Sequence, residues 1–126
     1  TNAMTDYGSR FKATDLHVNT TDRTLTVVFD DGASFTLPAE LLRVWSPSAE
    51  VRGHSPDERK TVSGKRDVNI MDVKPVGRYA VKVKFSDLHE TGIYSWETLR
   101  DFGERQQELW DQYLAELAEK GLSREA

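Results

Sequence analysis

Two short segments, residues 42–54 and 89–96, concentrate the side chains of this chain that could do chemistry. Each mixes aromatic, charged and histidine residues with a glycine, where a segment that only packs into a core would show a simple apolar period. Binding residues concentrate in loops of this kind. The candidate surface therefore comprises Arg43, Ser46, Ser48, Glu50, Arg52, His54, His89, Tyr94 and Trp96.

The three histidines are the first candidates for a metal site. An iron(II) oxygenase binds its metal through two histidines and a carboxylate. No histidine here is followed two residues later by Asp or Glu, the spacing that a close ligand pair would have. His54 and His89 could still meet in the fold with Glu50 or Asp87, as in a small ligand- or metal-binding protein or an enzyme. The plainer interpretation is solvated or hydrogen-bonded histidines, and we expect no metal and no cofactor.

Nucleophiles are equally sparse. The chain has no cysteine, which excludes disulfides, thiolate zinc sites, cysteine-ligated iron–sulfur clusters and cysteine nucleophiles. Ser46 and Ser95 stand where a serine would cap a helix, and capping explains both without catalysis. The sequence contains no Gly-x-Ser-x-Gly elbow and no phosphate-binding glycine loop. We therefore expect that the protein is not an enzyme.

Length and charge further restrict which kinds of protein this chain could be. A chain of 126 residues suits a single domain, and its net charge of −4 gives no attraction to nucleic acid or to an anionic membrane. Lys74, Arg78, Lys82 and Lys84 are best explained as solvated residues of a strand, because lysines discourage edge-to-edge pairing. No apolar run of membrane-spanning length and no signal segment occurs, so a cytoplasmic protein is expected.

The first half of the chain predicts an antiparallel meander. Asp15–Asn19 and Thr24–Phe29 alternate apolar and polar residues, Asp31-Gly32 is a common hairpin turn, and Ser34–Leu37 returns as a third strand. Pro38 then opens a short helix that ends near Val44, since proline is tolerated at a first helical position.

The second half predicts a hairpin followed by helices. The polar stretch 52–67 is expected to be a mobile surface loop. A hairpin turns at Gly77 between Val68–Val76 and Arg78–Phe85, with Tyr79 and the alternate apolar residues after it on one face, and 92–95 adds a short strand. Apolar residues then recur at helical spacing to Gly121, with Gly103 either breaking a helix or allowing close packing.

These elements predict one α+β domain over residues 14–121. Its strands form two antiparallel units, with a short helix after the third strand and a C-terminal helical segment. Residues 1–13 are expected to be a tag remnant, Thr1-Asn2-Ala3, followed by a loose tail, and residues 122–126 to be a C-terminal tail.

The two segments resemble a known family, the N-terminal domain of gamma-butyrobetaine hydroxylase. The resemblance covers most of Leu16 to Gly121. Its most specific residues are Leu42-Arg43, Ser46-Pro47-Ser48-Ala49-Glu50-Val51, Gly53-His54, Gly92-Ile93-Tyr94-Ser95-Trp96 and Leu109-Trp110.

In that hydroxylase and its trimethyllysine relative, a domain of this kind precedes the oxygenase domain. There it binds zinc through three cysteines and a histidine, and the resemblance would imply the same site here. The cysteine-bearing segment aligns with Ser46, Ser48 and Val51, and the histidine with His89. Serine and valine cannot replace thiolates around zinc. The resemblance therefore implies the fold, and contact between residues 46–53 and 89–96, without the metal. Hydrogen bonds and ion pairs among Arg43, Glu50 and His89 are expected to hold the two segments together instead. The chain ends after its last helix, so hydroxylase activity is not expected either.

Similar domains also occur attached to P-loop ATPases that carry iron–sulfur clusters. The resemblance thus suggests a non-catalytic interaction or accessory domain that assists such a carrier in cluster assembly or transfer. Without cysteine, the chain could not hold a cluster through thiolates itself. A protein partner is expected, and no nucleic acid or membrane.

Overall fold

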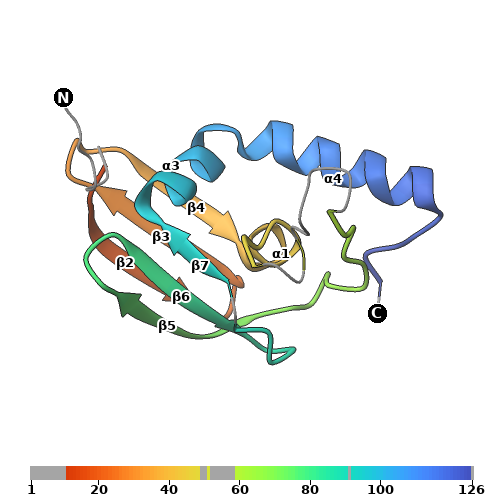
Figure 1. Cartoon of the computed structure of the whole chain (residues 1–126), viewed down its shortest axis with the longest axis horizontal. Helices are drawn as coiled ribbons and strands as arrows, with labels where there is room; N and C mark the ends of the chain where they lie inside the picture. The colour runs from red at the N-terminus through yellow and green to blue at the C-terminus, as the bar shows by residue number, and fades with distance from the viewer. Residues whose placement is uncertain (1–10, 49–50, 52–58, 91, 126) are drawn as a thin grey trace.

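The structure is a computed structural model that describes residues 11–48, 51, 59–90 and 92–125. Its described strands form two three-stranded antiparallel sheets, in the orders β2-β3-β4 and β5-β6-β7 (Figure 1). The predicted α+β class is confirmed. Most of the predicted N-terminal tail lies outside the described residues, and none of the described helices is long and apolar enough to span a membrane.

The first sheet is the predicted meander. It consists of β2 (Ala13–Asn19), β3 (Thr24–Phe29) and β4 (Ser34–Pro38). The alternation in β3 places Leu25, Val27 and Phe29 in the core, while β2 is mostly exposed. Pro38 is the last residue of β4 and the N-cap of α1 (Ala39–Val44). It was predicted to be the first residue of the helix, so the helix begins one residue later than predicted. Its missing N–H costs nothing at either position.

The second sheet holds β5 (Ile70–Val76), β6 (Ala80–Phe85) and β7 (Ile93–Ser95). Val81, Val83 and Phe85 point into the core as their alternation predicts. Tyr79, which was expected on the same face, instead lies in the hairpin turn and is half-exposed. The turn begins at Gly77 with φ +61°, a value that favours glycine.

The C-terminal helices are α3 (Trp96–Glu104) and α4 (Gln106–Lys120). The Ser95 hydroxyl accepts a hydrogen bond of 3.1 Å from the backbone N–H of Thr98, which confirms the predicted cap. A Cβ on Gly103 would lie 2.3 Å from the Cγ of Phe35, so this glycine permits close packing and does not end α3. The chain leaves α4 at Gly121 with φ +66°, the predicted stop.

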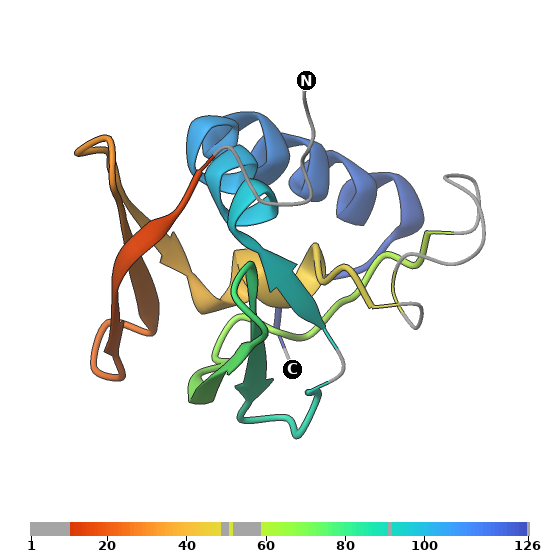
Figure 2. The same cartoon turned by 60° about the vertical axis from the view of Figure 1, so that its left-hand side comes forward.

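One hydrophobic cluster joins both sheets to the helices. It takes residues from β3, β4, β5, β6 and β7, together with α1, α3 and Leu109 of α4. Figure 2, turned from the first view, shows the two sheets side by side with α3 and α4 along one end of both. A second cluster lies between the end of α1 and α4 and comprises Val44, Val51, Val62, Tyr113 and Leu117.

The described part of the polar stretch is anchored, which differs from the predicted loose loop. Val62 is buried, and the Tyr113 hydroxyl donates a 2.7 Å hydrogen bond to its carbonyl. The guanidinium of Arg59 lies 3.6 Å from the ring centroid of Trp45. A single buried valine creates no apolar period, so this contact could not be predicted from the sequence pattern. Residues 52–58 of the stretch lie outside the described part.

The C-terminal tail closes over the same stretch. The backbone N–H groups of Gly64 and Arg66 donate to the carbonyls of Ser123 and Arg124 at 2.9 and 3.0 Å. Arg124 also donates two hydrogen bonds, of 2.8 and 2.7 Å, to the buried carboxylate of Glu40. Figure 1 shows this tail returning beside the segment that leads to β5.

Candidate functional site

A buried cluster of two serines and a histidine forms the centre of the candidate site. The Nε2 of His89 lies 3.0 Å from the Oγ of Ser46 and 3.4 Å from the Oγ of Ser48. Ser46 donates to Ser48 at 3.2 Å and accepts the Ser48 backbone N–H at 3.3 Å. The three residues are only 2%, 5% and 8% exposed. The predicted contact between the two segments is confirmed for these residues.

The end of α1 positions the serines. Trp45 is the C-cap residue of α1, and its indole N–H donates to the Leu109 carbonyl at 3.2 Å, which ties the helix end to α4. The chain then turns inward, and Ser46 is placed directly after this fixed point. The Ser46 hydroxyl accepts the Ser48 N–H, but no helix begins at Pro47, where Ser46 was expected to cap one. Ser46 also contacts His89, which sequence reasoning did not foresee.

A tight turn after β6 positions His89. The N–H of Leu88 donates to the Phe85 carbonyl at 2.9 Å, and the N–H of Phe85 donates to the His89 carbonyl at 2.9 Å. The carboxylate of Asp87 accepts the His89 backbone N–H at 3.1 Å. These hydrogen bonds fix the backbone of the turn that carries His89.

Gly92 allows the close approach of the two segments. A Cβ at this position would lie 2.4 Å from the Ser46 Oγ and 3.2 Å from the Cε1 of Tyr94. Real Cβ atoms do not approach another atom as closely as 2.4 Å, so a larger residue would displace the Ser46 hydroxyl from its hydrogen bonds or move the segments apart. The glycine of the second segment therefore has a packing role at the cluster.

Asp87 links the cluster to two cations. Its Oδ2 lies 2.8 Å from the Arg43 Nε and 2.6 Å from the Lys65 Nζ. Partial burial acts to raise the pKa of Asp87, but the hydrogen bonds from Lys65 and Arg43 outweigh it and lower the pKa to about 2. The carboxylate therefore stays ionised at neutral pH and holds the end of α1 to the turn before His89.

A cavity of about 250 Å³ opens beside this network. Its walls include Arg43, Val51, Lys60, Lys65 and His89. It thus lies between the end of α1, the stretch before β5 and the turn after β6. Of the residues that the sequence singles out, Arg43 and His89 line it.

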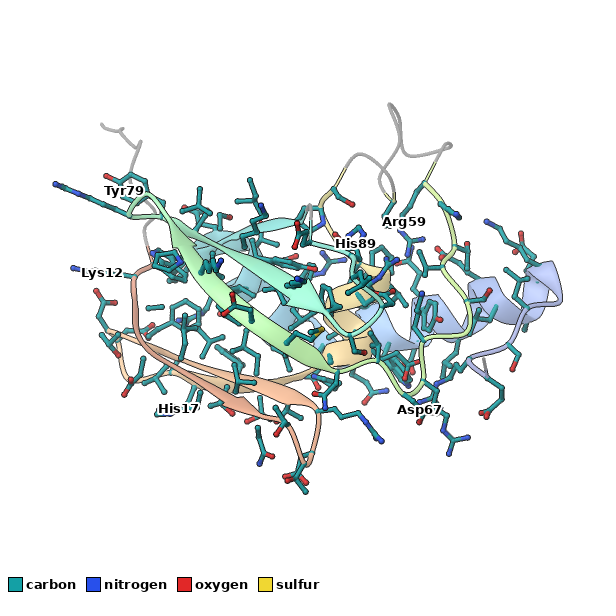
Figure 3. All side chains as sticks on the ribbon, turned by 90° about the horizontal axis from the view of Figure 1, so that it is seen from below. Lys12, His17, Arg59, Asp67, Tyr79 and His89 are labelled. Atoms are coloured by element: carbon teal, nitrogen blue, oxygen red, sulfur yellow. The ribbon has the colours of Figure 1, made fainter. Side chains whose placement is uncertain are left out.

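Other candidate residues do not form an exposed surface with His89. Tyr94, expected at a surface, is fully buried next to Ser46, and its hydroxyl donates to the Leu42 carbonyl. Trp96 donates from its indole to the Arg78 carbonyl at 2.8 Å, at the end of β6 away from His89. Figure 3 shows His17 far from His89. The remaining three candidates, Glu50, Arg52 and His54, lie outside the described residues.

The arrangement favours a structural role for the cluster over catalysis. A nucleophile has to be reached by its substrate, and the hydroxyls of Ser46 and Ser48 are buried. Within the described part of the chain, no group of three or more His, Asp and Glu residues is placed to hold a metal. Burial raises the pKa of Tyr94, so its hydroxyl stays protonated and acts as a hydrogen-bond donor.

Sequence reasoning missed Lys65 altogether. It lies in the polar stretch, far in sequence from both segments, and meets Asp87 only through the fold. Asp87 was considered only as a metal-site carboxylate. Its position two residues before His89 was the available signal, because Asp commonly accepts backbone N–H groups within a turn.

The fold and the cluster define an α+β domain in which the segment after α1 meets the turn after β6 through a contact between Ser46 and His89. The family model described as gamma-butyrobetaine hydroxylase-like, N-terminal, matches residues 16–100, and the chain belongs to this family. A comparison with curated proteins found no significant match.

Solved structures agree with this assignment. One solution NMR structure is 47% identical over 97% of this chain and 91% of its own, with a TM-score of 0.81. Another is 40% identical over 93% and 92%, with a TM-score of 0.80. A crystal structure of a DUF971-family protein of unknown function from Acidithiobacillus ferrooxidans ATCC 23270 is 36% identical over 73% and 92%, with a TM-score of 0.62.

Proposed function

We propose that the protein is a non-catalytic accessory module that presents the turn after β6 to a partner protein. The observation that carries this proposal is Leu88, which is 67% exposed and has a left-handed backbone with φ +72°. That conformation costs a non-glycine residue about 1–2 kcal/mol. The exposed side chain recovers little of this cost by burial, so Leu88 has no evident role in folding.

The turn suits Leu88 for recognition. Hydrogen bonds on both sides of it, from Leu88 to Phe85 and from Phe85 to His89, fix its backbone. A left-handed residue after such a turn is usually glycine, because glycine adopts positive φ without strain. A leucine held there displays an apolar side chain in one orientation, which lowers the entropy lost on binding. Strain at an exposed position supports a functional hypothesis.

The buried cluster supports a binding role over an enzymatic one. Ser46 and His89 are hydrogen-bonded and closed off by Gly92 and Tyr94, and they hold the base of the displayed turn. The alternative enzyme or metal site would use His89 with His54 and Glu50, both outside the described residues. No geometry among the described residues favours that alternative.

A P-loop iron–sulfur cluster carrier is the proposed class of partner. This part of the proposal rests on the resemblance to domains that occur attached to such ATPases. The chain has no cysteine, so it would assist the carrier and would not hold the cluster by thiolates.

Leu88→Gly tests the proposal, with Val76→Ser as the matched control. Both residues are exposed and apolar, but Val76 pairs with Ala80 at the opposite end of β5 from the turn. Biolayer interferometry against a purified P-loop iron–sulfur carrier from the same cell should show binding by the wild type. Leu88→Gly should weaken this binding about tenfold or more, as for an interface hot spot, and Val76→Ser should leave it unchanged.

The outcomes separate the two parts of the proposal. Leu88→Gly should stay folded, because glycine relieves the left-handed strain, so lost binding would not reflect unfolding. No binding by the wild type would refute the carrier as partner. Equal binding by the wild type and Leu88→Gly would refute the turn as the contact surface.

A further inference from the structure

The cavity beside His89 is rich in cationic side chains. Arg43, Lys60 and Lys65 are among its lining residues, and His89 adds an imidazole. No carboxylate is among the described lining residues. The protein as a whole carries a net charge of −4, so this concentration of positive charge is local.

Asp87 compensates only part of this charge. Its Oδ2 serves both Arg43 and Lys65, so one negative charge faces two positive charges. Among the described residues, the Nη1 of Arg43 is buried and has no hydrogen-bond partner. Buried cationic nitrogens are normally paired, because an unpaired one has lost its water without replacement. The guanidinium is therefore incompletely neutralised in the free protein.

The size and the donors of the cavity suit a small ligand. Its volume of about 250 Å³ lies below the range of about 300–1,000 Å³ found for drug-sized ligands. Arg43 offers a planar donor group, the two lysines offer point charges, and the lining residue Ser63 adds a hydroxyl. These groups donate hydrogen bonds to oxygen and attract negative charge.

We propose that this cavity binds a small oxyanion, a phosphate or a carboxylate, between Arg43, Lys60 and Lys65. The inference goes beyond the proposed partner interaction, which uses the exposed Leu88. It remains testable if that interaction is wrong, because it rests on the cavity and its charges alone.

A second lysine-rich hollow on the protein provides an internal control. It is lined by Lys74, Lys82 and Lys84 together with Asp72 and Glu90. Two of its lysines already have carboxylate neighbours, with Lys74 at 3.6 Å from Asp72 and Lys84 at 3.7 Å from Glu90. Its charges are therefore largely balanced within the hollow, and it should not concentrate an anion.

Amide-detected NMR titration of the full chain at constant ionic strength tests the proposal. Inorganic phosphate and succinate are the two probes, with chloride as the reference anion. One or both probes should produce saturable shifts at residues 60–65 and 89, and the responsive probe identifies phosphate or carboxylate chemistry. Lys60→Gln and Lys65→Gln should each weaken binding about tenfold or more, as expected for the loss of one charge-assisted contact. Lys82→Gln, with the same charge change on the other hollow, should alter it less than about twofold, because charges outside the cavity are screened by salt.

Three results would overturn the proposal. The first is a response to phosphate and succinate no larger than that to chloride. The second is shifts that do not saturate or that are as large around Lys82 as around Lys60. The third is an equal effect of Lys60→Gln, Lys65→Gln and Lys82→Gln, which would show general screening. The amide spectra also report whether each variant is folded, so a loss of binding cannot be mistaken for unfolding.

Discussion

Substituting Gly92 by alanine tests the packing that joins the two segments. The new Cβ would lie 2.4 Å from the Ser46 Oγ, so either this hydroxyl rotates out of its hydrogen bonds or the chain shifts before the methyl group fits. Overpacking of this kind costs about 1–3 kcal/mol of unfolding free energy. Ser46→Ala should cost a similar amount, about 1–3 kcal/mol, because it removes the hydroxyl that hydrogen-bonds the Ser48 N–H and the His89 ring nitrogen.

The double variant gives the sharper result. Ser46→Ala removes the atom with which the new methyl group at position 92 would collide, so the two costs should not add. We expect the double variant to be more stable than the sum predicts by about 1–2 kcal/mol, within the range found for residues in contact. Some cost of Gly92→Ala should remain, since the new Cβ would also lie 3.2 Å from Tyr94.

Urea unfolding followed by tryptophan fluorescence measures these differences, with the three tryptophans as probes. Gly103→Ala is the matched control, because its Cβ would meet Phe35 and not Ser46. Gly103→Ala and Ser46→Ala should therefore be additive. If Gly92→Ala and Ser46→Ala are additive as well, the close contact between the two segments does not exist as described.

Two further predictions concern the same region. The lowered pKa of Asp87, about 2 against an ordinary 3.8, means that its ion pairs stabilise the fold above pH 4. This contribution, about 2 kcal/mol, should be lost as the pH falls from about 4 to 2. Asp87→Asn should remove most of that acid dependence in urea titrations at each pH, and an unchanged dependence would contradict it. The wild type should retain no stoichiometric zinc in elemental analysis after dialysis against a weak chelator. A variant with cysteines at Ser46, Ser48 and Val51 should bind about one zinc per chain with His89, and failure to do so would show that these positions do not surround one point.

Local sequence patterns were sufficient for most of the elements. The alternation in Thr24–Phe29 and Ala80–Phe85 predicts strands, because successive side chains of a strand point to opposite faces. Gly77 and Gly121 mark a turn and a helix end through their left-handed backbones. Such signals come from neighbouring residues and do not depend on the rest of the fold.

The contact between the two segments was predicted from the resemblance. Of the residues expected to replace the missing metal, Glu50 lies outside the described residues. Among the described residues, Arg43 pairs with Asp87 and the serines themselves contact His89, and neither contact was predicted. The sequence shows that the thiolates are missing, but which polar groups then satisfy each other depends on distances that only the packed chain sets.

Tertiary structure also decided which residues face outward. Ile93 and Tyr94 are adjacent on a three-residue strand, so either could have faced the core. The pairing of Tyr94 with the buried Val81 sends Tyr94 inward and leaves Ile93 half-exposed. Lys65 reaches Asp87 from a stretch with no regular pattern. Periodicity reports the faces of an element, whereas the choice of the buried face and of long-range ion pairs belongs to the assembly of the whole chain.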